Sequence, residues 1–224
     1  MLVNADFSRR AIVTPDQYEW IASPQPGVER VMLDRVGAEQ ARATSIVRYA
    51  PGSRFPHHQH PGGEEILVLS GTLSDDSGHH PAGWYLRNPP GSSHRTFSEE
   101  GAVIFVKLRQ MAANESQRVS INTYDSACWR LEAIRDVCML FSNNEEHVCV
   151  QRVPPGHTLF ASPVERAELL VLAGEVAMGR QRCERGSWIR LPAGDFPMLT
   201  AGAQGATVYC KTGRAANGPA EAQA

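Results

Sequence analysis

The amino-acid sequence predicts an all-β chain of two similar domains, and three observations support this prediction. The length of 224 residues suits two domains of about 100 residues each. Short runs rich in β-branched and aromatic residues alternate with Gly, Pro and Ser, as in sheet proteins with tight turns. The second half also repeats features of the first at an offset of about one hundred residues.

The expected elements are almost all strands. One short helical turn is expected over residues 14–20, with Thr14 as its N-cap and Pro15 at the first helical position. The predicted strands cover residues 43–49, 66–69, 84–88 and 103–108 in the first half, and 148–153, 168–172, 188–191 and 207–211 in the second.

The internal repeat is clearest in three pairs of segments. EILVLSG at 65–71 recurs as ELLVLAG at 168–174, GWYLRNPPGSSH at 83–94 as GSWIRLPAGDFP at 186–197, and RYAPG at 48–52 as RVPPG at 152–156. Trp20 has a looser counterpart in Trp129, and Arg48 recurs as Arg152, which favours a structural role for this arginine. We therefore expect an N-terminal domain at 1–112, a linker at 110–117, a C-terminal domain at 113–213 and a flexible tail at 214–224.

Four residues of the first half form a candidate metal-ligand set: His58, His60, Glu64 and His94. Residues two apart on a strand leave the same face, so His58 and His60 are expected to point together. Glu64 follows a Pro-Gly-Gly turn and precedes an apolar run, where a carboxylate is costly unless a positive charge compensates it. A divalent cation would supply that charge, so we predict a metal site.

The other histidines have simpler explanations. A single histidine is more often a surface or hydrogen-bonded core residue than a ligand. His57 has the opposite strand parity to His58, and the remaining ones lie in a predicted turn or have no ligand-type partner at useful spacing. We expect structural roles for His57, His79, His80, His147 and His157.

The spacing around these ligands resembles a known family. G-x5-H-x-H-x3-E-x6-G, followed by G-x5-P-x-G-x2-H, is similar to the two characteristic motifs of the cupin superfamily. One position departs, because Ser98 stands where the second motif usually has Asn, which is not a ligand. The phrases PGGEE, LVLSG and PGSSH narrow the resemblance to the ChrR-like cupins, named after the sensory domain of an anti-sigma factor. The nine matching positions are Gly52, His58, His60, Glu64, Gly71, Gly83, Pro89, Gly91 and His94.

This resemblance implies two tandem cupin domains, each a jelly roll or double-stranded β-helix, and therefore a bicupin. It implies one divalent metal per chain at His58, His60, Glu64 and His94. ChrR-type cupins hold zinc, and other cupins use iron, manganese or nickel. The donor set alone suits Fe(II), Mn(II), Ni(II), Co(II) or Zn(II), and we expect zinc or iron first.

The second copy lacks these ligands. His58 and His60 correspond to about Ser162 and Val164, and His94 corresponds to Pro197, which has no donor atom in its side chain. Only Glu165 or Glu168 remains as an acid. We therefore expect the C-terminal domain to keep the turns of the fold without binding metal.

Two functions of different class follow. As in ChrR-like sensors, the metal-bound cupin would bind a small molecule or respond to oxidative signals. Those sensors bind a sigma factor through an N-terminal zinc domain, so sigma-factor binding is not expected on this chain alone. The alternative is an iron-dependent dioxygenase acting on a small dicarbonyl-type substrate. Whether the protein is an enzyme stays open at this point.

Composition narrows the partners and the location. A net charge of −2 gives no reason to expect nucleic acid or an anionic membrane. There is no apolar leader or spanning segment, so a cytoplasmic location is expected. The five cysteines are an odd number, all in the second half and without a Cys-x-x-Cys, so a disulfide framework is not expected. A homodimer is a further hypothesis from the duplication.

Overall fold

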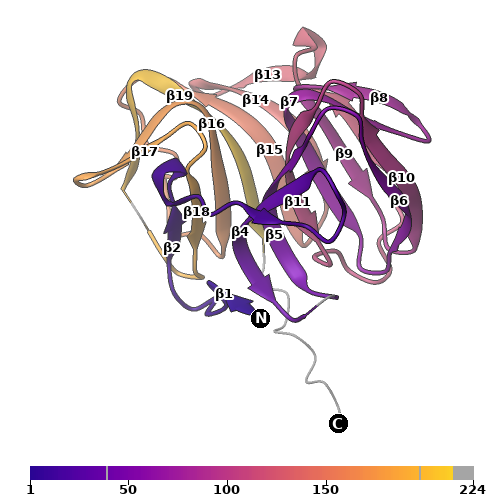
Figure 1. The fold of residues 1–224 in the computed structure, drawn as a ribbon. Coiled ribbons are helices and arrows are strands. Elements are labelled where there is room, and N and C mark those ends of the chain that lie inside the picture. The colour runs from indigo at the N-terminus through magenta and orange to yellow at the C-terminus, as the bar shows by residue number, and fades with distance from the viewer. Residues whose placement is uncertain (39, 197, 214–224) are drawn as a thin grey trace. The chain divides into compact units, whose positions relative to one another are not determined.

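The structure is a computed structural model that describes residues 1–38, 40–196 and 198–213. Its regular elements are strands, apart from two short 3₁₀ turns, η1 (Pro15–Gln17) and η2 (Ser126–Cys128) (Figure 1). The chain divides into two compact units. Unit 1 comprises residues 1–5 and 17–128, and unit 2 comprises residues 6–16 and the chain from residue 129.

Unit 1 is an antiparallel sheet structure with the order β1-β4-β5-β11-β7-β10-β6. Beside this path, β3 pairs with β4, β8 and β9 pair with β7, and β12 pairs with β9. Its strands are β1 (Leu2–Val3), β3 (Ile21–Ala22), β4 (Val28–Val36), β5 (Arg42–Tyr49), β6 (Ser53–His60), β7 (Glu64–Asp75), β8 (Gly78–Pro81), β9 (Trp84–Asn88), β10 (Ser92–Ser98), β11 (Ala102–Leu108) and β12 (Val119–Asn122).

Unit 2 has the related order β13-β14-β15-β19-β16-β18-β2, with β17 paired to β16. Figure 1 shows the indigo β2 beside the orange β18. The strands are β2 (Ala11–Val13), β13 (Trp129–Glu132), β14 (Arg135–Ser142), β15 (Glu146–Val153), β16 (Ala167–Met178), β17 (Gln181–Glu184), β18 (Trp188–Leu191) and β19 (Leu199–Gly213).

The predicted all-β class is confirmed, and each predicted strand lies within or largely overlaps an observed one. Each unit has an apolar core, because alternate residues on a strand face the same side. In unit 1, Ile66, Val68 and Leu73 of β7 pack with Ile104 and Val106 of β11. In unit 2, the core combines buried residues of β15, β16, β17, β18 and β19 with Leu159 and Val164 from the segment before β16. The predicted helical turn shortens to η1.

The structure bears out the internal repeat at the level of side chains. The Arg48 guanidinium lies 4.2 Å from the ring centroid of Trp20, and that of Arg152 lies 3.7 Å from the ring of Trp129. Arg48 and Arg152 occupy matching registers, on β5 against β4 and on β15 against β14. A cation–π contact of this kind stabilises each unit and agrees with a structural role for the arginine.

The units differ from the domain boundaries expected from sequence. Residues 113–128, expected in the second domain, lie in unit 1 because β12 pairs with β9. Residues 6–16, expected in the first, lie in unit 2 because β2 pairs with β18. The segment 110–117 therefore leads to a strand of its own unit. The expected tail at 214–224 lies outside the described residues.

Across the described residues, no helix combines the length and the apolar character needed to cross a membrane.

Candidate metal centre

Two adjacent strands of unit 1 bring the three histidines together. His58 on β6 and His94 on β10 are direct register partners, and His60 stands opposite Ser92. The ring centroids of His58 and His60 lie 4.7 Å apart, so both rings leave the same face, as the spacing predicts. The ring of His94 lies 5.1 Å from that of His58 and 4.8 Å from that of His60.

A tight turn before β7 positions the carboxylate of Glu64. Gly63 has a φ of 75°, a left-handed conformation that favours glycine, and a Cβ atom there would collide with the Met111 side chain. The chain then enters β7 at Glu64, whose register partner on β9 is Asn88. The Asn88 amide donates a hydrogen bond of 3.1 Å to Glu64 Oε2.

Donor atoms of the four predicted ligands lie within 4.8 Å of one another. His60 Nε2 and His94 Nε2 are 3.0 Å apart, and Glu64 Oε2 lies 3.4 Å from the first and 3.2 Å from the second. Ligands about 2.0–2.2 Å from one metal, at angles between octahedral and tetrahedral, are separated by about 2.8–3.6 Å, a range that includes all three distances. The cluster can therefore hold a divalent metal ion.

Hydrogen bonds orient two of the imidazoles. His58 Nδ1 lies 2.8 Å from the Pro56 carbonyl oxygen, and His94 Nδ1 lies 3.3 Å from Asp75 Oδ2. An Nδ1–H that donates to an oxygen leaves Nε2 as the free lone pair, which is the usual arrangement of metal-binding histidines.

Asp75 and His80 extend the site and were not predicted from the sequence. Asp75 Oδ1 lies 3.2 Å from His80 Nε2 and accepts a hydrogen bond from the Ser77 hydroxyl. The His80 ring packs against Trp84, with 5.5 Å between centroids. Asp75 therefore connects His94 to a second buried histidine.

The cluster is charged as well as buried. Burial lowers the pKa of His60, which favours its neutral form. Burial opposes the charged form of His94 too, but hydrogen bonds to Asp75 and Glu64 outweigh it and raise its pKa to about 9. Burial would raise the pKa of Glu64, yet the hydrogen bond to His94 and the charge of His60 hold it below its ordinary value. The surroundings thus favour an ionised Glu64 next to a protonated His94.

The four residues of the cluster differ in their exposure to solvent. His60, Glu64 and His94 are 6%, 6% and 5% exposed, whereas His58 is only half-buried. His58 is therefore the ligand nearest to solvent, and the Phe55 ring lies 4.8 Å from its ring.

Two apolar residues of unit 2, Val164 and Ala167, stand at the positions of His60 and Glu64. The Gly91 amide donates to the His60 carbonyl, and the Gly194 amide donates in the same way to that of Val164, which makes Val164 the counterpart of His60. Ala167 and Leu191 pair as Glu64 and Asn88 do. Pro197, the counterpart of His94, lies outside the described residues. Of the remaining acids, Glu168 accepts a hydrogen bond from Trp188 Nε1.

The other histidines stay apart from the cluster. His57, His79, His147 and His157 are exposed, and His79 and His147 lie within hydrogen-bonding distance of Ser74 and Ser142. His80 is the exception, because it reaches the cluster through Asp75.

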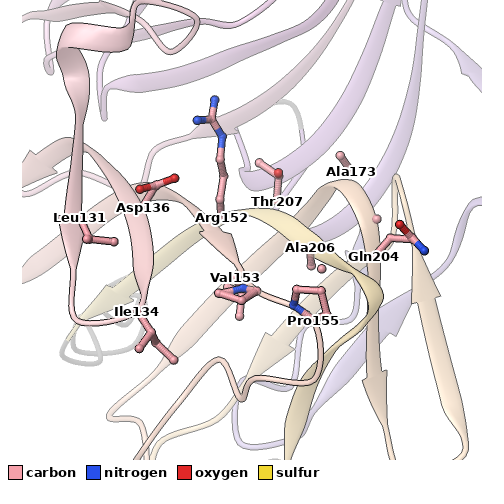
Figure 2. A pocket seen from close by; sticks show the side chains of 13 residues that line it. Leu131, Ile134, Asp136, Arg152, Val153, Pro155, Ala173, Gln204, Ala206 and Thr207 are labelled. Atoms are coloured by element: carbon pink, nitrogen blue, oxygen red, sulfur yellow. The ribbon is translucent and has the colours of Figure 1, made fainter.

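Unit 2 carries a surface pocket of about 370 Å³ (Figure 2). Its wall combines Leu131, Ile134 and Pro155 with one acid, Asp136, and one base, Arg152. None of the four predicted ligands lines it, so this pocket is not part of the candidate metal centre.

Comparison with known proteins agrees with this geometry. Residues 8–112 match the family model described as "ChrR Cupin-like domain". A search of curated proteins gives no match.

Several solved structures share the fold over nearly the whole chain. A candidate dioxygenase from Nostoc punctiforme has a TM-score of 0.74 at 15% identity. The match covers 95% of this chain and 85% of the dioxygenase chain. Ylba from Escherichia coli has a TM-score of 0.68 at 17% identity, covering 92% of each chain. The pirin YhhW from E. coli, in complex with nickel(II), has a TM-score of 0.66 at 12% identity. The match covers 92% of this chain and 99% of the pirin chain.

At these identities the structural likeness shows the fold, and the family comes from the sequence match. The protein is a cupin-fold chain whose residues 8–112 match the ChrR Cupin-like domain family.

Proposed function

We propose that unit 1 binds one divalent transition metal through His58, His60, Glu64 and His94, and that this centre takes up a small ligand to which the protein responds. The observation that carries the proposal is the convergence of three buried donor atoms at separations of 3.0–3.4 Å. Buried groups of this kind are costly unless a cation or hydrogen bonds compensate them.

Each residue has a distinct part. His60, His94 and Glu64 would supply the buried donors, and His58 the donor nearest solvent. Asn88 and Asp75 would hold Glu64 and His94 in place through hydrogen bonds. A bound divalent metal would polarise an oxygen-donor ligand.

Four protein ligands would leave one or two positions on a five- or six-coordinate ion, and a small molecule would reach them past the half-buried His58. The ChrR Cupin-like match supports a sensory role, in which ligand or oxidant changes the metal centre. The donor set suits zinc, iron, manganese, nickel or cobalt; the resemblance to ChrR-type cupins and the dioxygenase alternative put zinc and iron first, and the nickel-bound pirin has a related fold.

A second candidate is an iron-dependent dioxygenase acting on a small dicarbonyl compound. It is favoured by the partial exposure of His58 and by the likeness to the candidate dioxygenase from Nostoc punctiforme. In that reaction His58, His60, Glu64 and His94 would hold the metal, and the remaining positions would receive a chelating substrate and dioxygen.

Cobalt(II) spectroscopy tests the proposal. Titration of metal-free protein with Co(II) should give visible bands that saturate at one ion per chain, and acetylacetone, a small chelating dicarbonyl, should shift them. His60→Val, which introduces the residue found at the counterpart position 164, should abolish the bands. Saturable bands that acetylacetone leaves unchanged would contradict an open ligand site.

The same additive separates the two candidates. Protein loaded with Fe(II) should consume dioxygen in the presence of acetylacetone if it is a dioxygenase. Binding of acetylacetone without oxygen consumption would favour the ligand-responsive module.

A further inference from the structure

Unit 2 contains two cysteines that face each other across neighbouring strands. Cys149 on β15 and Cys210 on β19 are direct register partners. The Cα atoms of such partners lie about 4.5–5.5 Å apart in antiparallel sheets, within the range of about 4.4–6.8 Å that disulfides span. The backbone therefore holds these two thiols at a separation compatible with a disulfide bond.

The two thiols also interact. The Cys210 thiol donates a hydrogen bond to the Cys149 sulfur, and this bond is the main cause of a lowered pKa at Cys149. Burial and the carboxylate of Glu132 oppose the shift, and the guanidinium of Arg135 adds to it. The bond and burial together raise the pKa of Cys210, while a hydrogen bond to Gln151 opposes that rise. Cys149 is therefore the better nucleophile of the pair.

The exposure of the two thiols also favours Cys149 as the nucleophile. Cys149 is half-buried, whereas Cys210 is buried and 3% exposed. An oxidant from solvent can thus reach Cys149 first, with Cys210 in place behind it.

The remaining three cysteines lack this arrangement, and Cys128 lies in η2, outside the strands. Cys138 and Cys183 are fully buried, with Val150 and Trp129 as register partners of the first and Val176 as that of the second. Burial raises the pKa of Cys183, so that thiol is less reactive. Among the described strands, Cys149 and Cys210 form the one register pair made of two cysteines.

Unit 1 shows that the fold does not need thiols at these positions. Arg48 and Arg152 occupy matching registers in the two units, and the residues three before them are Ser45 and Cys149. Ser45 pairs with Val106 as Cys149 pairs with Cys210. Both Ser45 and Val106 are buried, at 5% and 6% exposure.

We propose that Cys149 and Cys210 form an oxidant-sensitive dithiol site that takes hydrogen peroxide and closes to a disulfide. The Cys149 thiolate attacks one peroxide oxygen, which gives a sulfenic acid and, after protonation, one water. The Cys210 sulfur then attacks the Cys149 sulfur, an S–S bond forms, and hydroxide leaves as a second water with the Cys210 proton. Two thiols lose two electrons, and one peroxide is reduced to two waters.

This site goes beyond the metal centre and does not depend on it. The disulfide would join β15 to β19 within unit 2, which contains no counterpart of the metal-ligand cluster among its described residues. Unit 2 would then respond to oxidant by a covalent change of its own, reversible by thiol reductants.

Thiol counting and mass spectrometry test the proposal on the full chain. The reduced, metal-free protein is treated with one equivalent of hydrogen peroxide and then analysed under denaturing conditions. The thiol count should fall from five to three, the intact mass should fall by two hydrogens, and a non-reduced digest should contain Cys149 linked to Cys210. Retention of all five thiols, or a disulfide between other cysteines, would overturn it.

Two variants serve as matched controls, each replacing one cysteine by its counterpart in unit 1, Ser45 or Val106. Cys210→Val should leave a sulfenic acid on Cys149 that dimedone traps, because the resolving thiol is gone. Cys149→Ser should lose the fast reaction altogether. Equal peroxide reactivity in Cys149→Ser and the parent chain would also contradict the assignment. Since EDTA-treated protein is used throughout, failure here leaves the proposed metal function untouched.

Discussion

Asp75 Oδ2 lies 3.3 Å from His94 Nδ1, so a carboxylate at the end of β7 orients a predicted metal ligand on β10. Both side chains are buried, at 8% and 5% exposure. The contact turns His94 Nε2 toward Glu64 and His60. Asp75 is thereby a positioning residue of the proposed metal centre.

Asp75→Asn should weaken metal binding about 10- to 100-fold, the usual effect of removing a partner behind a ligand. The substitution keeps the shape of the side chain and removes the charge that favours a protonated His94, so the pKa of His94 in the metal-free protein should also fall. Competition with a chromogenic chelator measures the first effect, and an NMR titration of the imidazole measures the second.

Asp76→Asn is the matched control for this prediction. Asp76 is the next residue, is 46% exposed and pairs with Arg95. Its substitution should leave the metal affinity and the His94 titration unchanged. Equal losses in both variants would mean that Asp75 acts only through the general negative charge of this region.

His94→Ala should remove most of the bound metal and preserve the fold. The counterpart position in the sequence of unit 2 is Pro197, so an imidazole there is not needed for a cupin to form. The variant should keep the far-ultraviolet circular dichroism spectrum of the parent and lose about 1–3 kcal/mol of unfolding free energy, because Asp75 and Glu64 lose a hydrogen-bond partner. Global unfolding would refute the comparison between the two units.

Replacing the cluster by its counterparts in unit 2 should give a folded protein without metal. The triple variant His60→Val, Glu64→Ala, Asn88→Leu introduces the residues found at 164, 167 and 191. Well-packed apolar side chains often match or exceed the stability of buried polar groups. Chemical denaturation in EDTA should therefore give an unfolding free energy at least equal to that of the metal-free parent. A lower value would show that unit 1 needs its polar cluster even without metal.

The buried Tyr49 predicts a loss of stability at high pH. Burial raises its pKa to about 12 from the ordinary value of 10.0, and its hydroxyl lies 3.1 Å from that of Thr96. The unfolded chain ionises first, so this contribution is complete below pH 10 and is lost as the pH rises to about 12, by roughly 2–3 kcal/mol. Denaturant titrations between pH 9 and 12 should show a smaller decline in Tyr49→Phe, whereas Tyr124→Phe, at a 71% exposed position, should behave as the parent.

The sequence was sufficient for the strands and the four clustered residues because both depend on local patterns. His58 and His60 obey strand parity, and the glycines that frame Glu64 fix the turn before β7. The repeat at 48–52 and 152–156 likewise indicated a structural role for Arg48, and the structure places Arg48 and Arg152 each against a tryptophan.

The role of Asp75 was not predicted from strand parity because β7 contains a bulge. Ile104 pairs with Val68 and Val103 with Ser70, which leaves Leu69 as an extra residue on β7. The bulge inverts the parity of the strand, so that Leu73 joins the core of Ile66 and Val68. Asp75 therefore shares the face of Glu64 although eleven positions, an odd number, separate them.

The boundaries of the two units were not predicted from the sequence because they depend on long-range strand pairing. Residues 11–13 pair with 188–190, and residues 119–122 pair with 84–87. Neither pairing leaves a local signal in composition or spacing, so a division at the polar segment 110–117 was the simplest expectation.

Elemental analysis of the chain purified without added metal or a nickel column tests the central claim most directly, with His60→Ala as its control. We expect close to one equivalent of a divalent transition metal in the parent and little in the variant. Iron would direct further work to dioxygenase activity, and zinc to a sensory role. Absence of metal from both proteins, or equal metal in both, would contradict a metal centre built on His58, His60, Glu64 and His94.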